Sequence, residues 1–385
     1  MKALALFKRL LTIDPASHHS VMILGPRGTG KTHWIKQHFP RAIYFDLLDD
    51  ETYAELLAQP TRLAERIPSD YTGWVIIDEI QKVPALLNEV HRQIENFGRR
   101  FILTGSSARK LRRRGVNLLA GRALIYHMHP LTSYELGDQF DLKTALTYGL
   151  LPAIYGHENP KHYLSSYIGT YLKEEVLQEG LSRNLALFTR FLETASFSQG
   201  EVINYTNIAH EVNSNRHTMV NFFEILEDLL IAYRLPVFTR RAKRDVIAHP
   251  KFYYFDVGIY RTLRPRGPLD IDSEIDGPAL ETLFLQQIKA INEYDALSYQ
   301  IYYWRTRTQL EVDFVLYGER GFYAFEIKRK NKIIPKDLQA LRTFHEDYKE
   351  ASCYLVYGGT RSYIDNDIHV VPFLDLFQNL RSLLA

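Results

Sequence analysis

The 385-residue sequence is poor in cysteine, with Cys353 as the single one. One cysteine excludes an internal disulfide and any metal site built from several thiolates, and it fits a reducing compartment. No apolar run approaches the roughly 18 residues that a membrane-spanning helix needs. The net charge is only +2, so the overall charge does not by itself indicate a partner. We therefore expect a cytoplasmic protein with no membrane partner.

Residues 25–32 match the phosphate-binding loop pattern G-x-x-x-x-G-K-[ST]. The loop follows the apolar run 21–24 and precedes helical sequence over 33–39. Glycines let backbone N–H groups approach phosphate oxygens, and a helix N-terminus adds a positive dipole. Lys31 can bridge the β- and γ-phosphates, and the Thr32 hydroxyl can ligate Mg²⁺. The loop predicts ATP and Mg²⁺ as cofactors, held by Gly25, Pro26, Arg27, Gly28, Thr29, Gly30, Lys31 and Thr32.

The apolar run 74–77 ends in two acidic residues, Asp78 and Glu79. A continuous apolar run is typical of a buried parallel strand. In phosphate-loop NTPases the first acid supports Mg²⁺ and the second can polarise the attacking water. The next expected strand, 100–107, ends in small polar residues that can sense the γ-phosphate or cap a following helix. These are Thr104, Ser106 and Ser107, of which Ser106 is the preferred sensor.

Arg122 directly precedes another expected strand, 123–128. It could reach the nucleotide of a neighbouring subunit as an arginine finger, or it could have only a surface or structural role. Upstream of it, residues 99–114 contain seven basic side chains and no acid. Such a run is either a solvated surface or a contact for polyanions. Its candidate DNA-binding residues are Arg112, Arg113 and Arg114.

These motifs together resemble the AAA+ class of ATPases. More narrowly, they resemble a large prokaryotic family of AAA+ proteins that carry a C-terminal domain of unknown function; the related signal-transducing NTPases are the alternative. If Arg122 is a finger, the protein must be an oligomer to hydrolyse ATP well, and our hypothesis is a homo-oligomeric ring, expected to be a hexamer. The resemblance also implies a helical connecting segment. No convincing second sensor arginine is found in that segment, which puts the usual lid closure in doubt.

Residues 185–270 contain three helical stretches, 185–196, 204–212 and a longer one after 213–218, followed by two short aromatic strands, 235–238 and 251–256. Three helices and a hairpin predict a winged helix, whose third helix begins at the major groove. Ser214 or Asn213 is the expected cap of that helix. Candidate DNA contacts are Arg216 on the helix, and Arg241 and Arg244 on the hairpin. The alternative is a spacer between proteins.

An acidic stretch, 270–277, is expected to be a linker. Beyond it, Asp313 on one expected strand and Glu326-x-Lys328 on the next follow the PD-(D/E)xK nuclease pattern. Two such carboxylates can hold a metal ion against a phosphate, and the lysine can position water. The order of elements resembles the restriction-endonuclease fold, which implies Glu281 on the preceding helix as a further metal ligand. The proline of the pattern is absent and Glu311 competes with Asp313, so DNA cleavage is left open. The alternative is a fold kept only for DNA binding or for subunit contact.

We thus predict an α/β chain with four parts: an AAA+ phosphate-loop core over 1–130, a helical lid or connector over 131–184, a winged helix over 185–270 and a nuclease-like α/β domain over 271–385. The predicted function is ATP binding and hydrolysis coupled to ring assembly on double-stranded DNA. Two alternatives are an ATP-dependent nuclease using Asp313, Glu326 and Lys328, and a signalling or defence switch with a protein partner.

Overall fold

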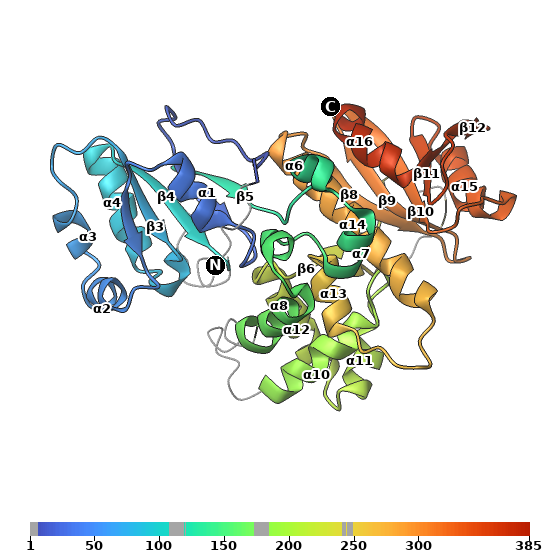
Figure 1. The fold of residues 1–385 in the computed structure, drawn as a ribbon, viewed down its shortest axis with the longest axis horizontal. Helices are drawn as coiled ribbons and strands as arrows, with labels where there is room; N and C mark the ends of the chain where they lie inside the picture. Colours follow the sequence, from blue (N-terminus) through green and yellow to red (C-terminus); the bar gives the residue numbers. More distant parts are fainter. Residues whose placement is uncertain (1–6, 108–118, 120, 173–184, 241–243, 245–248) are drawn as a thin grey trace. The chain divides into compact units, whose positions relative to one another are not determined.

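The computed structural model in Figure 1 describes residues 7–107, 119, 121–172, 185–240, 244 and 249–385. The chain divides into two compact units, one of residues 8–130 and 224–231, the other of residues 1–7, 131–223 and 232–385. This division is coarser than the four segments predicted from the sequence. The predicted DNA contacts Arg112, Arg113, Arg114 and Arg241 lie outside the described residues.

The first unit is built on a parallel five-stranded sheet in the order β2-β3-β4-β1-β5. This confirms the predicted α/β core with a parallel sheet. Because β4 lies between β1 and β3, its carboxyl end separates the phosphate loop from the acidic pair. The strands are β1 (Ser20–Leu24), β2 (Ile43–Asp46), β3 (Trp74–Asp78), β4 (Arg100–Gly105) and β5 (Ala123–His127); the helices are α1 (Lys31–His38), α2 (Asp50–Ala58), α3 (Arg62–Glu65), the 3₁₀ helix Ile80–Lys82 and α4 (Leu86–Phe97).

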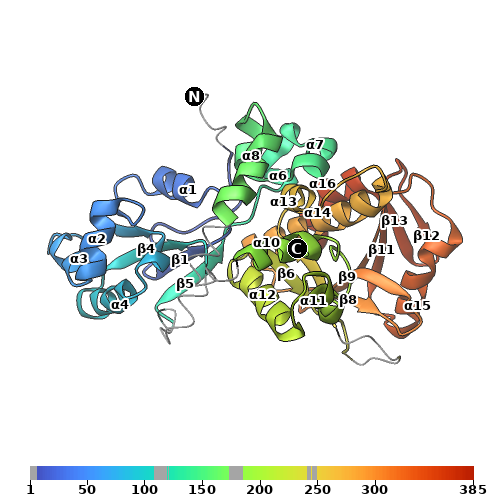
Figure 2. The same ribbon diagram turned by 90° about the horizontal axis from the view of Figure 1, so that it is seen from below.

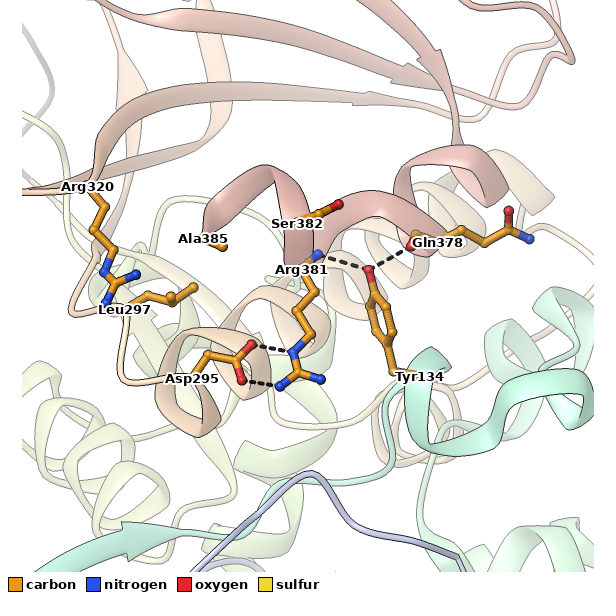
Figure 3. Close-up of a pocket in the computed structure, with 8 residues that line it drawn as sticks. All are labelled: Tyr134, Asp295, Leu297, Arg320, Gln378, Arg381, Ser382 and Ala385. Atoms are coloured by element: carbon orange, nitrogen blue, oxygen red, sulfur yellow. Dashed lines mark hydrogen bonds and ion pairs between the residues drawn. The ribbon is translucent and has the colours of Figure 1, made fainter.

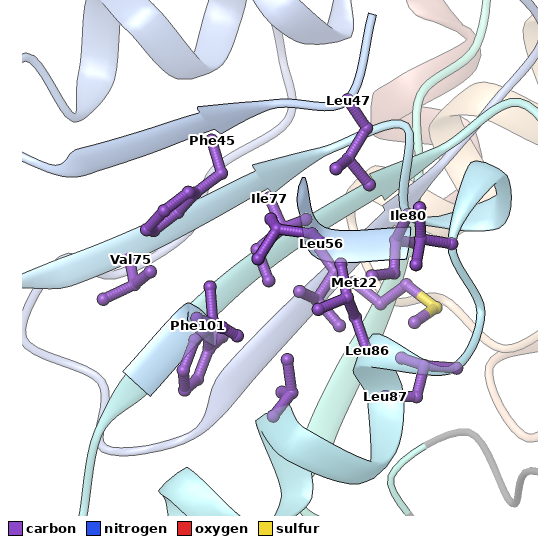
Figure 4. Packing of buried hydrophobic residues seen from close by; sticks show 14 of the residues in the cluster. Met22, Phe45, Leu47, Leu56, Val75, Ile77, Ile80, Leu86, Leu87 and Phe101 are labelled. Carbon is purple, nitrogen blue, oxygen red and sulfur yellow. The ribbon is translucent and has the colours of Figure 1, made fainter. Parts of the chain in front are cut away.

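One face of this sheet packs against α2, α3 and α4 (Figure 4). Alternation along a strand sends successive side chains to opposite faces. Met22 therefore joins this core, together with Phe45, Val75 and Phe101. On the opposite face, Tyr44 contacts Lys36 of α1 and Trp74 contacts Phe39 at the end of α1. Both faces are thus buried, which explains why β1 and β3 read as continuous apolar runs.

The second unit begins with short helices that pack on its own C-terminal helices. They are α6 (Ser133–Leu136), a 3₁₀ turn Gly137–Gln139, α7 (Leu142–Tyr148), a 3₁₀ helix Pro152–Gly156, α8 (Pro160–Ser166) and the π-helical turn Tyr167–Leu172. The Tyr134 hydroxyl of α6 donates to Gln378 O at 2.9 Å and accepts from Arg381 N at 2.9 Å (Figure 3). These bonds join α6, near the start of the segment predicted as a lid, to α16 (Phe373–Leu384).

Three helices and a two-stranded antiparallel sheet come next: α10 (Leu185–Ser196), α11 (Tyr205–Glu211), α12 (Arg216–Asp228), β6 (Ala232–Leu235) and β7 (Lys251–Tyr254). The order is the predicted one, while its assignment as a winged helix stays a prediction. Asn215 caps α12, because its side chain accepts from Thr218 N at 2.9 Å, so the expected cap at Ser214 or Asn213 is wrong. The first strand runs from Ala232 to Leu235 rather than over 235–238. Residues 236–238 pair instead with Tyr303 of the C-terminal sheet, where Phe238 N donates to Tyr303 O at 2.7 Å.

The rest of the second unit is a six-stranded mixed sheet in the order β12-β13-β11-β10-β9-β8. Its strands are drawn in orange to red in Figure 2. Phe344 of α15 packs on Phe322, and Phe284 of α14 packs on Phe325, so helices cover both faces. The elements are α13 (Val257–Leu263), α14 (Asp272–Tyr294), β8 (Gln300–Arg305), β9 (Glu311–Gly318), β10 (Gly321–Lys328), a 3₁₀ helix Pro335–Leu338, α15 (Gln339–Asp347), β11 (Ser352–Tyr357), β12 (Tyr363–Asp365), β13 (Ile368–Pro372) and α16.

The linker expected at 270–277 is wrong for most of its length, since α14 begins at Asp272 and continues through Pro278. Tertiary contacts hold this acidic turn in the helix. Ile275 is buried, and Asp276 pairs with Arg261 at 2.7 Å and with Arg329 at 2.9 Å.

Over the part of the chain that the structure describes, no helix combines the length and the apolar character needed to cross a membrane.

Candidate functional site

The phosphate loop connects β1 to α1, at the carboxyl end of the parallel sheet. Gly28 and Gly30 have φ values of 81° and 94°, in the left-handed region that favours glycine, and Gly30 is the N-cap of α1. A Cβ atom on Gly25 would lie 2.4 Å from Met128 O. The loop therefore requires glycine at these three positions, and its backbone turns directly into a helix N-terminus.

Lys31 and Thr32, the first residues of α1, lie where the sequence predicts them. The buried Lys31 ammonium donates to Gly25 O at 2.7 Å and to Pro26 O at 3.2 Å, so it lies inside the turn of the loop. The Thr32 hydroxyl donates to Asp78 Oδ2 at 2.7 Å. Thus the two predicted Mg²⁺ ligands come from α1 and from the end of β3 and are already in contact.

Asp78 is the centre of a network at the ends of three strands. Besides Thr32, it accepts hydrogen bonds from the hydroxyls of Thr104 at the end of β4 and of Tyr44 on β2. Burial, followed by the hydrogen bond to Asp78, raises the pKa of Tyr44, which keeps this phenol a neutral donor. Asp78 is 1% exposed, so these donors compensate its desolvation.

Glu79 has φ 60° and ψ 46°, a left-handed conformation that costs energy in a residue with a side chain. Its N–H donates to Thr104 Oγ1 at 2.9 Å, which helps to hold the turn. Its carboxylate accepts from Gln81 Nε2 and, at 3.3 Å, from the Ser106 hydroxyl. Gln81 also donates to Ser106 Oγ at 2.8 Å. Ser106 is therefore joined to Glu79, and Thr104 to Asp78.

Arg122 is placed by a tight turn before β5, an edge strand of the sheet. Its N–H donates to Leu119 O at 2.6 Å, and Leu119 itself has φ 49°. The guanidinium pairs with Glu95 on α4. Two apolar side chains of β5, Leu124 and Ile125, are 43% and 45% exposed. The predicted finger arginine thus borders an apolar edge of the sheet.

A second cluster of charged residues lies in the C-terminal sheet. Phe314 of β9 is paired with Phe325 of β10, which brings Asp313 and Glu326 to the same end of these antiparallel strands. Asp313 accepts from Ile327 N at 2.8 Å, and Lys328 lies 2.5 Å from Glu326. These three residues therefore lie close together on two neighbouring strands, while their role as a nuclease site stays a prediction.

The cluster also contains Glu281 and Glu311, which the sequence offered as candidate ligands, and Lys251, which was not predicted. Lys251, at the start of β7, lies 3.8 Å from Glu281 and 3.5 Å from Asp313, and it also pairs with Glu311. Its side chain is 1% exposed. Over the described residues, no group of three or more histidine, cysteine, aspartate or glutamate side chains is arranged to hold a metal ion.

Burial is the largest cause of the raised pKa values of Glu281, Glu311 and Glu326 in this cluster. It raises the pKa of Glu326 to about 8, with repulsion from Asp313 adding to the effect. The same two causes raise the pKa of Glu281 to about 8, against the opposing attraction of Lys251. For Lys251 burial alone would lower the pKa, but the surrounding acids and Tyr253 raise it well above its ordinary range. Lys251 is therefore a cation at neutral pH.

Three family descriptions match successive parts of the chain. An AAA domain matches residues 17–137, a domain of unknown function (DUF8612) matches residues 139–273, and another (DUF4143) matches residues 276–376. The first match covers the phosphate loop, the acidic pair and Arg122. The chain is an AAA-domain protein with a C-terminal domain of unknown function. An AAA domain implies nucleotide binding and hydrolysis.

Relatives and solved structures give further comparisons with this AAA-domain protein. An uncharacterized protein of Mycobacterium tuberculosis is 26% identical over 370 residues, covering 91% of this chain and 79% of that protein. The Orc1 protein of Aeropyrum pernix, solved with DNA, is 14% identical and covers 64% of this chain and 86% of its own, with a TM-score of 0.26. A Vibrio cholerae protein is 13% identical with coverages of 95% and 97% and a TM-score of 0.24. TM-scores this low do not establish a shared fold.

The described candidates for DNA contact differ in their surroundings. Arg216 is exposed at the start of α12, with its guanidinium 5.7 Å from the ring centroid of Tyr205. Arg244 pairs with Asp347 at 2.8 Å and with Glu346 at 3.3 Å on α15. A polyanion would therefore compete with two carboxylates for Arg244, while the groove-facing position of Arg216 stays a prediction.

Several residues of the AAA domain and of the C-terminal cluster were not predicted. Arg9 donates to Thr29 O at 2.5 Å and to His129 O at 2.6 Å, which braces the phosphate loop from a distant part of the sequence. Tyr44 and Gln81 support the acidic pair. Only Lys251 carried a sequence signal: it begins an otherwise aromatic strand, where a charged residue has to be paired if it is buried.

Proposed function

We propose that this protein is a cytoplasmic, Mg²⁺-dependent ATPase that assembles with copies of itself into a ring, expected to be a hexamer, on double-stranded DNA. The observation that carries the ATPase is the convergence of Lys31, Thr32, Asp78 and Glu79 at one edge of the parallel sheet. Assembly and DNA binding are supported by separate features of the two units.

The AAA domain supplies the groups that would bind the phosphates of ATP and the residue that would act on the γ-phosphate. Backbone N–H groups of the loop and the N-terminus of α1 would bind the phosphates, and Lys31 would exchange its two carbonyl acceptors for phosphate oxygens. Glu79 would orient and polarise the attacking water. Its strained backbone, held by Thr104, keeps the carboxylate beside Ser106 rather than along the strand.

The residues at the site fit a magnesium ion. Oxygen ligands are what Mg²⁺ prefers, and the Thr32 hydroxyl and the Asp78 carboxylate are 2.7 Å apart. Thr104 and Tyr44 donate to Asp78, so its carboxylate is oriented before any ion arrives. Bound there, the ion would neutralise phosphate charge.

Self-assembly is supported by the edge strand β5 and by Arg122. An edge strand with two exposed apolar side chains is a surface that another protein can cover. Arg122 lies next to this strand. Its ion pair with Glu95 is exposed, so breaking that pair would cost little free energy. An Arg122 that reaches the neighbour's nucleotide would make hydrolysis depend on assembly.

DNA binding is supported by the exposed start of α12 in the second unit. Arg216 and His217 are both exposed there, and Asn215 fixes the helix N-terminus. A further polar pocket of about 720 Å³ lies beyond the ends of β10 and β11 and includes Lys332 and Arg361. Both surfaces can bind phosphates without reading bases.

Mixing two inactive variants tests the shared site. Arg122→Ala and Lys31→Ala should each lose most ATPase activity, because one lacks the finger and the other the phosphate contact. Mixed in equal amounts, they should recover a measurable part of the rate, since some interfaces combine an intact loop with an intact Arg122. Arg92→Ala, which removes a similarly exposed arginine of α4, is the matched control and should stay active. No recovery in mixtures that still co-assemble by mass measurement would refute the shared site.

Salt titration tests the DNA proposal. The affinity for duplex DNA should fall steeply with salt, and Arg216→Ala should reduce the slope by about one, as expected for one lost phosphate contact. Arg190→Ala removes an exposed arginine of α10 and should leave the slope unchanged. A flat salt response of the unaltered protein would exclude phosphate-driven binding and favour a protein partner.

Thr104 and Ser106 should give separable kinetic defects. Thr104→Val removes two hydrogen bonds that orient Asp78 and Glu79, so it should raise the Mg²⁺ concentration needed for half-maximal ATPase activity. Ser106→Ala should lower kcat at saturating Mg²⁺ by about tenfold, the worth of one hydrogen bond to a charged group. Steady-state kinetics at varied Mg²⁺ measures both, and identical profiles for the two variants would contradict this division of roles.

A further inference from the structure

Lys251 occupies an unusual place for a lysine. It begins β7, a strand of the two-stranded sheet, yet its ammonium group lies among three acidic side chains that come from two other elements. These are Glu281 of α14 and Glu311 and Asp313 of β9. The Lys251 side chain is 1% exposed, so no solvent shares the stabilisation of its charge. The ammonium is therefore held entirely by the protein around it.

The metal ion implied by the nuclease-like pattern does not fit this arrangement. A divalent ion would need Asp313, Glu326 and Glu281 to direct oxygens at one point. Instead, Lys251 is 3.5 Å from Asp313 and 3.8 Å from Glu281, and Glu326 is paired with Lys328 at 2.5 Å. Arg305 also reaches Glu311, at 3.2 Å. Bringing a divalent cation into this space would place it against a buried ammonium of the same sign.

We infer that Lys251 serves as the built-in cation of this cluster, taking the place of a divalent metal ion and keeping the nuclease-like domain from cleaving DNA. The cluster then stabilises the junction between the β6–β7 sheet and the C-terminal sheet. Charge balance supports this role, because the carboxylates of Glu311 and Asp313 need a cation beside them and Lys251 supplies one without any ligand. The inference does not depend on the ATP site, so the two can fail separately.

Manganese binding provides the test. The full-length protein, without nucleotide, is titrated with Mn²⁺ and the free ion is followed by electron paramagnetic resonance. The unaltered protein and its Asp313→Asn variant should bind Mn²⁺ equally, because the cluster takes none. Lys251→Met should gain one Mn²⁺ per chain, and adding Asp313→Asn to it should remove that ion again.

Lys328→Met is the matched control, since it removes the other lysine of the cluster while leaving Lys251 in place. It should gain no ion, and an equal gain by both variants would overturn the specific role of Lys251. If Lys251→Met does not fold, the comparison of the unaltered protein with Asp313→Asn still tests the inference. An Mn²⁺ site in the unaltered protein that Asp313→Asn abolishes, or Asp313-dependent nicking of plasmid DNA in Mg²⁺ or Mn²⁺, would overturn the inference.

Discussion

Replacing Glu79 with glutamine should lower the rate of ATP hydrolysis by about two to four orders of magnitude, the usual contribution of a general base. Glutamine keeps the size of the side chain and the turn at Glu79, but it cannot polarise the attacking water. The loop and Asp78 are untouched, so ATP binding should be preserved. Single-turnover hydrolysis and equilibrium binding of a fluorescent ATP analogue measure the two effects.

Lys31→Ala supplies the contrasting variant. It removes the cation expected to contact the phosphates, so ATP binding and hydrolysis should fall together. Glu89→Gln changes an acid of α4 that binds Arg92 and Gln93 rather than the site, and it is the control for a generic loss of charge. If Glu79→Gln hydrolyses ATP at the unaltered rate, another residue polarises the water. If it no longer binds ATP, the role of Glu79 is structural.

The sequence was a good guide where a local pattern carries the chemistry. The loop, the two acids after a buried run and most strands of the parallel sheet could be predicted, because alternation and apolar runs report burial directly. The short strands β12 and β13 of the C-terminal sheet were not predicted. The loop glycines are required by local backbone geometry, namely the positive φ of Gly28 and Gly30 and the close approach at Gly25.

The errors and omissions arise from contacts between distant segments. The stretch 270–277 has the composition of a linker, but it is helical because Asp276 meets Arg261 and Arg329. Arg9 lies 20 positions from Thr29 and 120 from His129, so no local pattern reveals its role. Lys251 likewise acquires its partners only when β7 lies beside the C-terminal sheet.

Asp256 is a buried carboxylate that connects several elements of the second unit. It caps α13 by accepting from Gly258 N at 2.8 Å and Ile259 N at 3.3 Å. It also accepts from Leu150 N at 2.8 Å, beyond α7, and from Gln286 on α14 at 3.3 Å. It is completely buried. One carboxylate thus joins the connecting helices to the C-terminal domain.

Asp256→Ala should destabilise this unit by at least about 3 kcal/mol, because each buried donor left unsatisfied costs about 1–3 kcal/mol. Thermal unfolding, together with hydrogen exchange at the amides of α13, measures the loss. Asp295→Ala breaks the partly exposed pair with Arg381 in the same unit, and it should cost about 1 kcal/mol or less. Equal losses in the two variants would contradict a special role for Asp256.

The pH dependence of stability should also identify Asp256. Burial, opposed by its four hydrogen bonds, raises the pKa of Asp256 from 3.8 to about 6. Between these values the folded chain holds a proton that the unfolded chain has released, so this group's contribution to stability is complete below pH 4 and is lost as the pH rises towards 6. The slope is at most about 1.4 kcal/mol per pH unit. Asp256→Asn cannot titrate, so the difference in unfolding free energy between it and the unaltered protein should change across this window and stay constant above about pH 7. A difference that is constant from pH 4 to pH 7 would show that Asp256 stays ionised in the folded protein.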